Sequence, residues 1–79
     1  MDITILGVES RELLDLEINL LKVINKIEKD INIKKISDPK KIAERGIMSV
    51  PALIINGELK FSGEIPTVHE LKIILKNLK

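Results

Sequence analysis

The stretch that decides the fold reads GIMSVPALIINGELKFSG and runs from Gly46 to Gly63. Within it, Asn56-Gly57 is a strong signal for a β-hairpin, because both residues tolerate the positive φ angles of a two-residue turn. Residues 51–55 and 58–62, on either side of this dipeptide, are rich in apolar residues and are predicted as the two strands of the hairpin. This part of the chain is therefore expected to contribute an antiparallel pair of strands to a sheet.

Upstream of this stretch, two further strands and a long helix are predicted. Ile3-Thr4-Ile5-Leu6 is a short apolar run that ends at Gly7, as in a strand buried on both faces. Residues 31–36 form a second run, and residues from Ser10 to about Lys29 carry apolar side chains at helical spacing. A helix between two strands calls for a parallel pair with a right-handed crossover.

The long predicted helix has two apolar stripes. The first contains Leu13, Leu16, Leu20, Val23, Ile24 and Ile27, and the second contains Leu14, Ile18 and Leu21. A helix packed between a sheet and another helix would bury both stripes, and so would a helix that docks onto a partner. We favour packing within the domain.

Two more helices are predicted from their ends. Asp38 is suited to the N-cap of a short helix with Pro39 in its first turn, and Gly46 is a natural stop. Thr67 and Glu70 have the spacing of a capping box for the last helix. The buried face of that helix is expected to consist of Val68, Leu71, Ile74, Leu75 and Leu78.

The predicted order is therefore β-α-β-α-β-β-α. It indicates an α/β fold with a mixed four-stranded sheet and helices on both faces, formed by residues 1–79 as a single domain. A chain of 79 residues makes one small domain.

The composition excludes several classes of function. A net charge of +1 and a single aromatic residue, Phe61, argue against nucleic-acid binding, which needs clustered cations or stacking platforms. The chain has no apolar run of about 20 residues, so we expect a cytoplasmic protein without a membrane partner. The only histidine, His69, makes no metal set with scattered carboxylates. We therefore expect no metal and no cofactor.

The chain resembles thioredoxin-like proteins, and most of all the small archaeal and bacterial type called redox-active disulfide protein 2. The segments that carry the resemblance are residues 42–53, Asn56 to Lys60, Ser62-Gly63 and Pro66. In such proteins a first loop carries a Cys-x-x-Cys motif at a helix start, and a second loop presents a cis-proline beside it. The resemblance implies the same fold and a cis bond between Val50 and Pro51.

The departure from that family lies between Gly7 and Leu13, where the family has Gly-x-Gly-Cys-x-x-Cys. The two cysteine positions fall on Ser10 and Leu13, and Glu9 replaces a glycine. We interpret these changes as natural divergence, with Leu13 as a core residue. Thiol–disulfide exchange needs a thiolate to attack and a thiol to leave. A chain without cysteine cannot catalyse it.

The resemblance nevertheless implies a binding groove. Its expected residues are Glu9, Ser10, Ser49, Val50, Pro51 and Gly63. In thioredoxin-like proteins the residue before the cis-proline, here Val50, offers backbone groups to an extended substrate segment. We therefore expect a redox-inactive binding or adaptor module whose partner is an extended peptide or another protein, with no catalytic residue. A monomer or a weak homodimer fits this expectation.

Two alternatives remain open. Ser10 at a helix start is most simply an N-cap, but it also suits a site for a low-molecular-weight thiol, as in an enzyme related to oxidoreductases. The apolar stripe of the long helix suits a structural subunit that docks onto another protein, especially if Leu14, Ile18 and Ile73 are exposed together. The pairs Lys34-Lys35 and Lys40-Lys41 attract anions, although such pairs are more often solvated faces.

Overall fold

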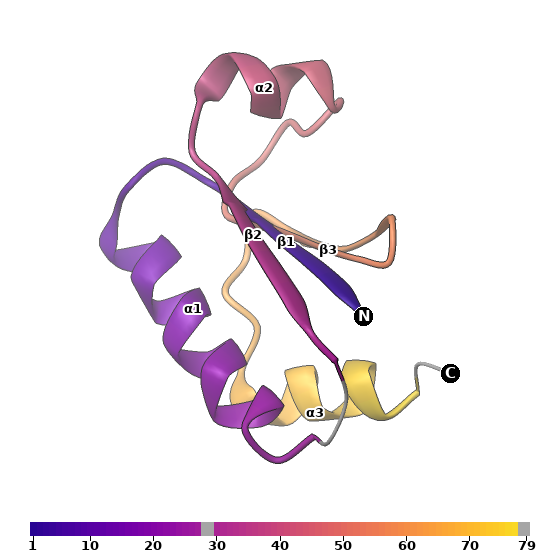
Figure 1. The fold of residues 1–79 in the computed structure, drawn as a ribbon. Coiled ribbons are helices and arrows are strands. Elements are labelled where there is room, and N and C mark those ends of the chain that lie inside the picture. Colours follow the sequence, from indigo (N-terminus) through magenta and orange to yellow (C-terminus); the bar gives the residue numbers. More distant parts are fainter. Residues whose placement is uncertain (28–29, 78–79) are drawn as a thin grey trace.

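A computed structural model describes residues 1–27 and 30–77 of the chain (Figure 1). The seven elements have the predicted order, β-α-β-α-β-β-α. They are β1 (Asp2–Leu6), α1 (Arg11–Ile24), β2 (Asn32–Ile36), α2 (Pro39–Glu44), β3 (Ala52–Ile55), β4 (Glu58–Ser62) and α3 (Val68–Lys76).

The four strands form one mixed sheet in the order β2-β1-β3-β4. β1 is parallel to β2 and antiparallel to β3, and β3 is antiparallel to β4. Ile5 of β1 lies opposite Lys35 on one side and Leu53 on the other. β1 is therefore an interior strand, which explains why its three apolar residues, Ile3, Ile5 and Leu6, are all buried.

Helices cover both faces of the sheet, with α1 and α3 on one face and α2 on the other (Figure 1). The larger core cluster joins Ile3 and Ile5 of β1 and Leu53 and Ile55 of β3 to the buried residues of α1 and α3. The smaller cluster, on the α2 face, consists of Leu6, Ile36, Ile42 and Ala52. The side-chain amide of Asn19 in α1 also donates a hydrogen bond to the Pro66 carbonyl (3.0 Å), which ties α1 to the segment before α3.

The predicted hairpin and caps are present. Asn56 and Gly57 have φ angles of 50° and 82°, the positive values that the two-residue turn requires. Asp38 caps α2 with Pro39 in its first turn, and Thr67 and Glu70 form the capping box of α3. In α3, Leu71 and Leu75 are buried, and Val68 and Ile74 are partly buried against the core; Leu78 lies outside the described residues.

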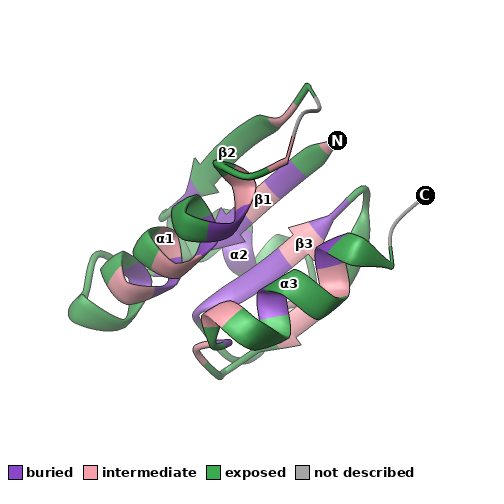
Figure 2. Cartoon of the chain, turned by 90° about the horizontal axis from the view of Figure 1, so that it is seen from below, coloured by how far each residue is buried: buried purple, intermediate pink, exposed green. Residues whose placement is uncertain are grey.

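The prediction that both stripes of α1 are buried within the domain is wrong. The first stripe packs on the sheet, but Leu14, Ile18 and Leu21 are 50%, 41% and 47% exposed. The physical reason is that α3 lies on the same face of the sheet as α1, so it leaves the outer side of α1 open to solvent (Figure 2).

The predicted length of α1 is also wrong. The helix ends at Ile24, and Asn25 is its C-cap. The N–H groups of Lys26 and Ile27 bond to the carbonyls of Val23 and Ile24, three residues back, so the chain tightens and leaves the helix. Lys29, the predicted end, lies outside the described residues. None of the helices in the described residues is long and apolar enough to span a bilayer.

Candidate functional site

Three segments meet at the end of the sheet where α1 begins. They are the loop from β1 to α1, the loop that enters β3, and Gly63 just after β4. Between them lies a groove of about 390 Å³. Its lining consists of Gly7, Val8, Ser10, Glu12, Val50, Pro51, Gly63 and Ile65.

Ser10 is the N-cap of α1. Its backbone is extended (φ −162°, ψ 171°), and its Oγ accepts a hydrogen bond from the Leu13 N–H at 3.2 Å. The Ser10 carbonyl accepts the first helical bond, from the Leu14 N–H, also at 3.2 Å. The hydroxyl oxygen is therefore engaged in stabilising the helix end.

The loop that enters β3 is fixed by contacts on both sides of its proline. The Val50–Pro51 bond is cis, and the Ser62 hydroxyl donates a hydrogen bond to the Ser49 carbonyl at 2.9 Å. The Gly63 N–H donates to the Pro51 carbonyl at 2.9 Å. Gly63 has a φ of +82°, and a Cβ at this position would lie only 2.9 Å from the Ser49 Cβ. A glycine is therefore required there for the two loops to approach each other.

The backbone N–H and C=O of Val50 have no hydrogen-bond partner among the described residues, 1–27 and 30–77. Its side chain is 39% exposed, and Val8, across the groove, is 46% exposed, whereas Pro51 is buried. The groove therefore offers one free donor and one free acceptor between two accessible apolar side chains.

Leu13 occupies the second position at which the resemblance places a cysteine. It is 1% exposed and packs in the larger core cluster. A Cβ on Gly7 would lie 3.1 Å from the Leu13 Cδ1 and 3.5 Å from the Pro51 Cα. The leucine thus fills the space behind the groove, as predicted, and the absence of a side chain on Gly7 leaves room for the close approach of β1, α1 and the proline loop.

Glu9 points to a different part of the surface. Its carboxylate lies 3.1 Å from the Lys35 amine on β2, and Glu17 of α1 lies 2.8 Å from the same amine. Hydrogen bonds to Glu17 and then to Glu9 raise the pKa of Lys35 above its ordinary value. Both acids and the lysine are solvent-accessible, so this network contributes little to stability.

The structure brings together four of the six residues predicted for the groove: Ser10, Val50, Pro51 and Gly63 line it. Glu9 pairs with Lys35 instead, and Ser49 supports Gly63 from behind without lining the groove.

Four lining residues were not predicted as site residues: Gly7, Val8, Glu12 and Ile65. Glu12 lies two residues after Ser10 in the first turn of α1. Its position next to the predicted helix start was the one sequence feature that could have placed it in the groove. Ile65 follows Gly63 in a segment without regular structure, where sequence periodicity gives no orientation.

The other chemical groups considered from the sequence do not join this site. His69 is exposed in the first turn of α3 and does not line the groove. No group of three or more His, Asp or Glu side chains among the described residues is arranged to hold a metal ion.

Comparison with known proteins agrees with this architecture. The model of the thioredoxin domain family matches residues 1–76. A protein named thioredoxin from the archaeon Methanothermobacter thermautotrophicus is 32% identical over 75 residues, which cover 95% of this chain and 97% of that protein. A search of solved structures gave no significant match. The family match over nearly the whole length, together with the sheet order and the cis-proline loop, shows that this chain belongs to the thioredoxin domain family.

Proposed function

We propose that this protein is a redox-inactive binding module that holds an extended peptide segment in the groove between Val8, Val50 and Gly63. The observation that carries the proposal is the unused backbone N–H and C=O of Val50 in a groove of about 390 Å³. An extended peptide satisfies such a pair of groups with its own main chain, as in strand addition to a sheet.

The side chains around Val50 indicate which peptides fit. Val8 and Val50 offer apolar surface on the two sides of the groove, and Glu12 is the one charged residue in its lining. An apolar peptide side chain would bury against the two valines, at about 25 cal/mol per Å² of apolar surface removed from water. A neighbouring Lys or Arg of the peptide would pair with Glu12.

The chemistry of the family is absent from this groove. The chain contains no cysteine, so neither the attacking thiolate nor the resolving thiol of dithiol exchange exists. The Ser10 hydroxyl oxygen is engaged as the cap of α1. Glu12 is the one titratable side chain that lines the groove, and the lining contains no histidine that could activate the hydroxyl. Binding without group transfer is therefore the activity that these residues support best.

The proposal is tested by selecting linear heptapeptides from a random display library and titrating the best binders into the ¹⁵N-labelled protein. We expect saturable amide shifts at Val8, Ser10 and Val50. Val8→Gln should weaken binding at least about fivefold, because it removes apolar contact area at the groove.

Ile73→Gln is the matched control, since Ile73 is 47% exposed on α3 and Val8 is 46% exposed in the groove. Equal affinity of the Val8→Gln variant and the unchanged protein would contradict the proposal. Shifts confined to Leu14, Ile18 and Leu21 would also contradict it and would assign binding to the open stripe of α1.

A further inference from the structure

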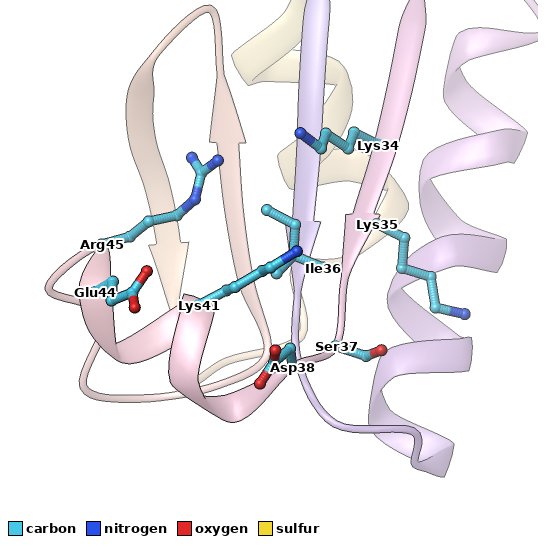
Figure 3. Close-up of a pocket in the computed structure, with 8 residues that line it drawn as sticks. All are labelled: Lys34, Lys35, Ile36, Ser37, Asp38, Lys41, Glu44 and Arg45. Carbon is cyan, nitrogen blue, oxygen red and sulfur yellow. The ribbon is translucent and has the colours of Figure 1, made fainter.

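A second cavity lies on the face of the sheet that α2 covers, between β2 and α2, and has a volume of about 640 Å³ (Figure 3). Its lining comes from the end of β2, the turn that follows and one side of α2. None of its lining residues is shared with the groove at Val50. Its floor includes Ile36, which is only 7% exposed and belongs to the smaller core cluster.

Three cationic side chains extend into this cavity from two elements. In Figure 3 the amine of Lys34 on β2, the amine of Lys41 on α2 and the guanidinium of Arg45 at the end of α2 all lie on the α2 side of the sheet. Lys35, the neighbour of Lys34, extends toward α1, where Glu17 and Glu9 hold its amine. The alternation of side chains along β2 thus separates the two lysines of this pair.

The three cations have no protein counter-ion among the described residues, since no ion pair there includes Lys34, Lys41 or Arg45. Lys41 and Arg45 are four residues apart on one helical face, where like charges repel.

Two acids also line the cavity, and they lower its net positive charge without cancelling it. The Asp38 carboxylate accepts the Lys40 N–H at 3.0 Å as the cap of α2, and Glu44 makes no ion pair with the three cations. An excess of positive charge therefore remains over an apolar floor, where electrostatic attraction is stronger than in bulk water.

We propose that this cavity binds a small phosphate-bearing anion. The planar guanidinium of Arg45 suits two oxygens of one phosphate group at once, and Lys34 of β2 and Lys41 of α2 supply point charges. The volume lies within the range of small-molecule sites, about 300–1,000 Å³. Binding would relieve the repulsion among the three cations. Lys34 and Lys35 both line the cavity, although Glu17 and Glu9 hold the Lys35 amine, and of the pair Lys40-Lys41 only Lys41 lines it.

The test uses inorganic pyrophosphate as the probe, titrated into the ¹⁵N-labelled protein at constant ionic strength maintained with sodium chloride. We expect saturable shifts at the amides of Ile36, Ser37, Lys41 and Arg45, and none at Val8 or Val50. Shifts that are absent, or that remain linear up to high millimolar probe, would overturn the proposal. The groove at Val50 is unaffected by either result, so the two proposals fail independently.

Variants decide whether the site is specific. Lys41→Gln and Arg45→Gln should each weaken binding about tenfold, the cost of losing one hydrogen bond to a charged group. Lys40→Gln is the matched control, because Lys40 precedes Lys41 in α2, carries the same charge and does not line the cavity. Equal losses of pyrophosphate affinity in all three variants would mean that the probe is attracted by the overall charge of the protein, and they would overturn the proposal.

A final comparison tests the class of anion. Arg45→Lys keeps the charge but removes the planar fork, so it should weaken pyrophosphate binding while leaving attraction of chloride unchanged. Citrate that binds as tightly as pyrophosphate would overturn the assignment to phosphate. All of these side chains are exposed, so the variants are expected to fold.

Discussion

Leu13 and Leu14 are adjacent residues of the same type with opposite surroundings. Leu13 is 1% exposed behind the groove, and Leu14 is 50% exposed on the outer side of α1. Leu13→Ala should lower the free energy of unfolding by about 2–5 kcal/mol, because it removes buried methyl groups and leaves a cavity. Leu14→Ala should change it by no more than about 0.5 kcal/mol. Urea denaturation of both variants checks the difference, and similar losses would mean that Leu13 is not a core residue.

Gly57 and Gly63 share a φ of +82° but differ in what surrounds them. An added Cβ meets nothing within 4 Å at Gly57, whereas at Gly63 it meets the Ser49 Cβ at 2.9 Å. Gly57→Ala should therefore lower the free energy of unfolding only by the backbone strain, about 1–2 kcal/mol.

Gly63→Ala should lower the free energy of unfolding more than Gly57→Ala does. It should also shift the amide resonances of Ser49 and Val50, because the proline loop must move. Equal destabilisation in urea, with unchanged loop resonances, would show that the two loops do not touch as described.

At the level of single elements, the start of α1 depends on Ser10. Ser10→Ala should lower the free energy of unfolding by about 1 kcal/mol, since the Leu13 N–H loses its acceptor. Ser10→Asp should retain the stability, because a carboxylate accepts the same bond and interacts favourably with the helix N-terminus. Thermal unfolding of both variants measures this. A destabilised Asp variant would argue against the capping role.

Lys35 links β2 to α1 and to the loop before it. Hydrogen bonds to Glu17 and Glu9 raise the pKa of Lys35 above its ordinary value of 10.5, so the folded protein binds this proton more tightly than the unfolded chain. The resulting stability is complete below pH 10.5 and is lost as the pH rises through the folded pKa.

Unfolding temperatures measured from pH 9 to about pH 12 should therefore fall more steeply for the unchanged protein than for a Lys35→Met variant. The contrast should shrink in high salt, because the carboxylates and the amine are accessible to ions. Parallel curves at low salt would contradict the linkage.

For the whole molecule, the sheet order predicts a gradient of local stability. β1 has hydrogen-bonded strands on both sides and helices over both faces, whereas β2 and β4 are edges. Amides of Ile3, Thr4 and Ile5 should exchange with deuterium most slowly, with rates that report global unfolding. Amides of β4 that face solvent should exchange by local opening. Uniform exchange across the four strands would contradict this order.

The order of elements was predictable because each one has a local signal. Asn56-Gly57 marks the hairpin, Thr67 with Glu70 marks the start of α3, and both signals involve only neighbouring residues. The open stripe of α1 was not predictable in this way. Leu14 and Ile18 have the sequence spacing of core residues, and only the position of α3 relative to α1 decides that they stay exposed.

The groove was partly predictable for the same reason. The resemblance supplied Val50, Pro51 and Gly63 as a set, but it placed Glu9 in the groove because a loop of that length has no periodicity to orient it. The partner of Glu9 is Lys35, 26 residues away in sequence, and such a pairing depends on the crossover from β1 to β2.

The central position of β1 also has a consequence for biosynthesis. Of the four strands the ribosome makes β1 before the others, and β2 can pair with it early, but the antiparallel neighbour β3 follows only after α2. The apolar residues that α3 covers cannot be buried by it until this helix has been synthesised. The larger core is therefore incomplete in the nascent chain until Leu71 and Leu75 of α3 reach the sheet.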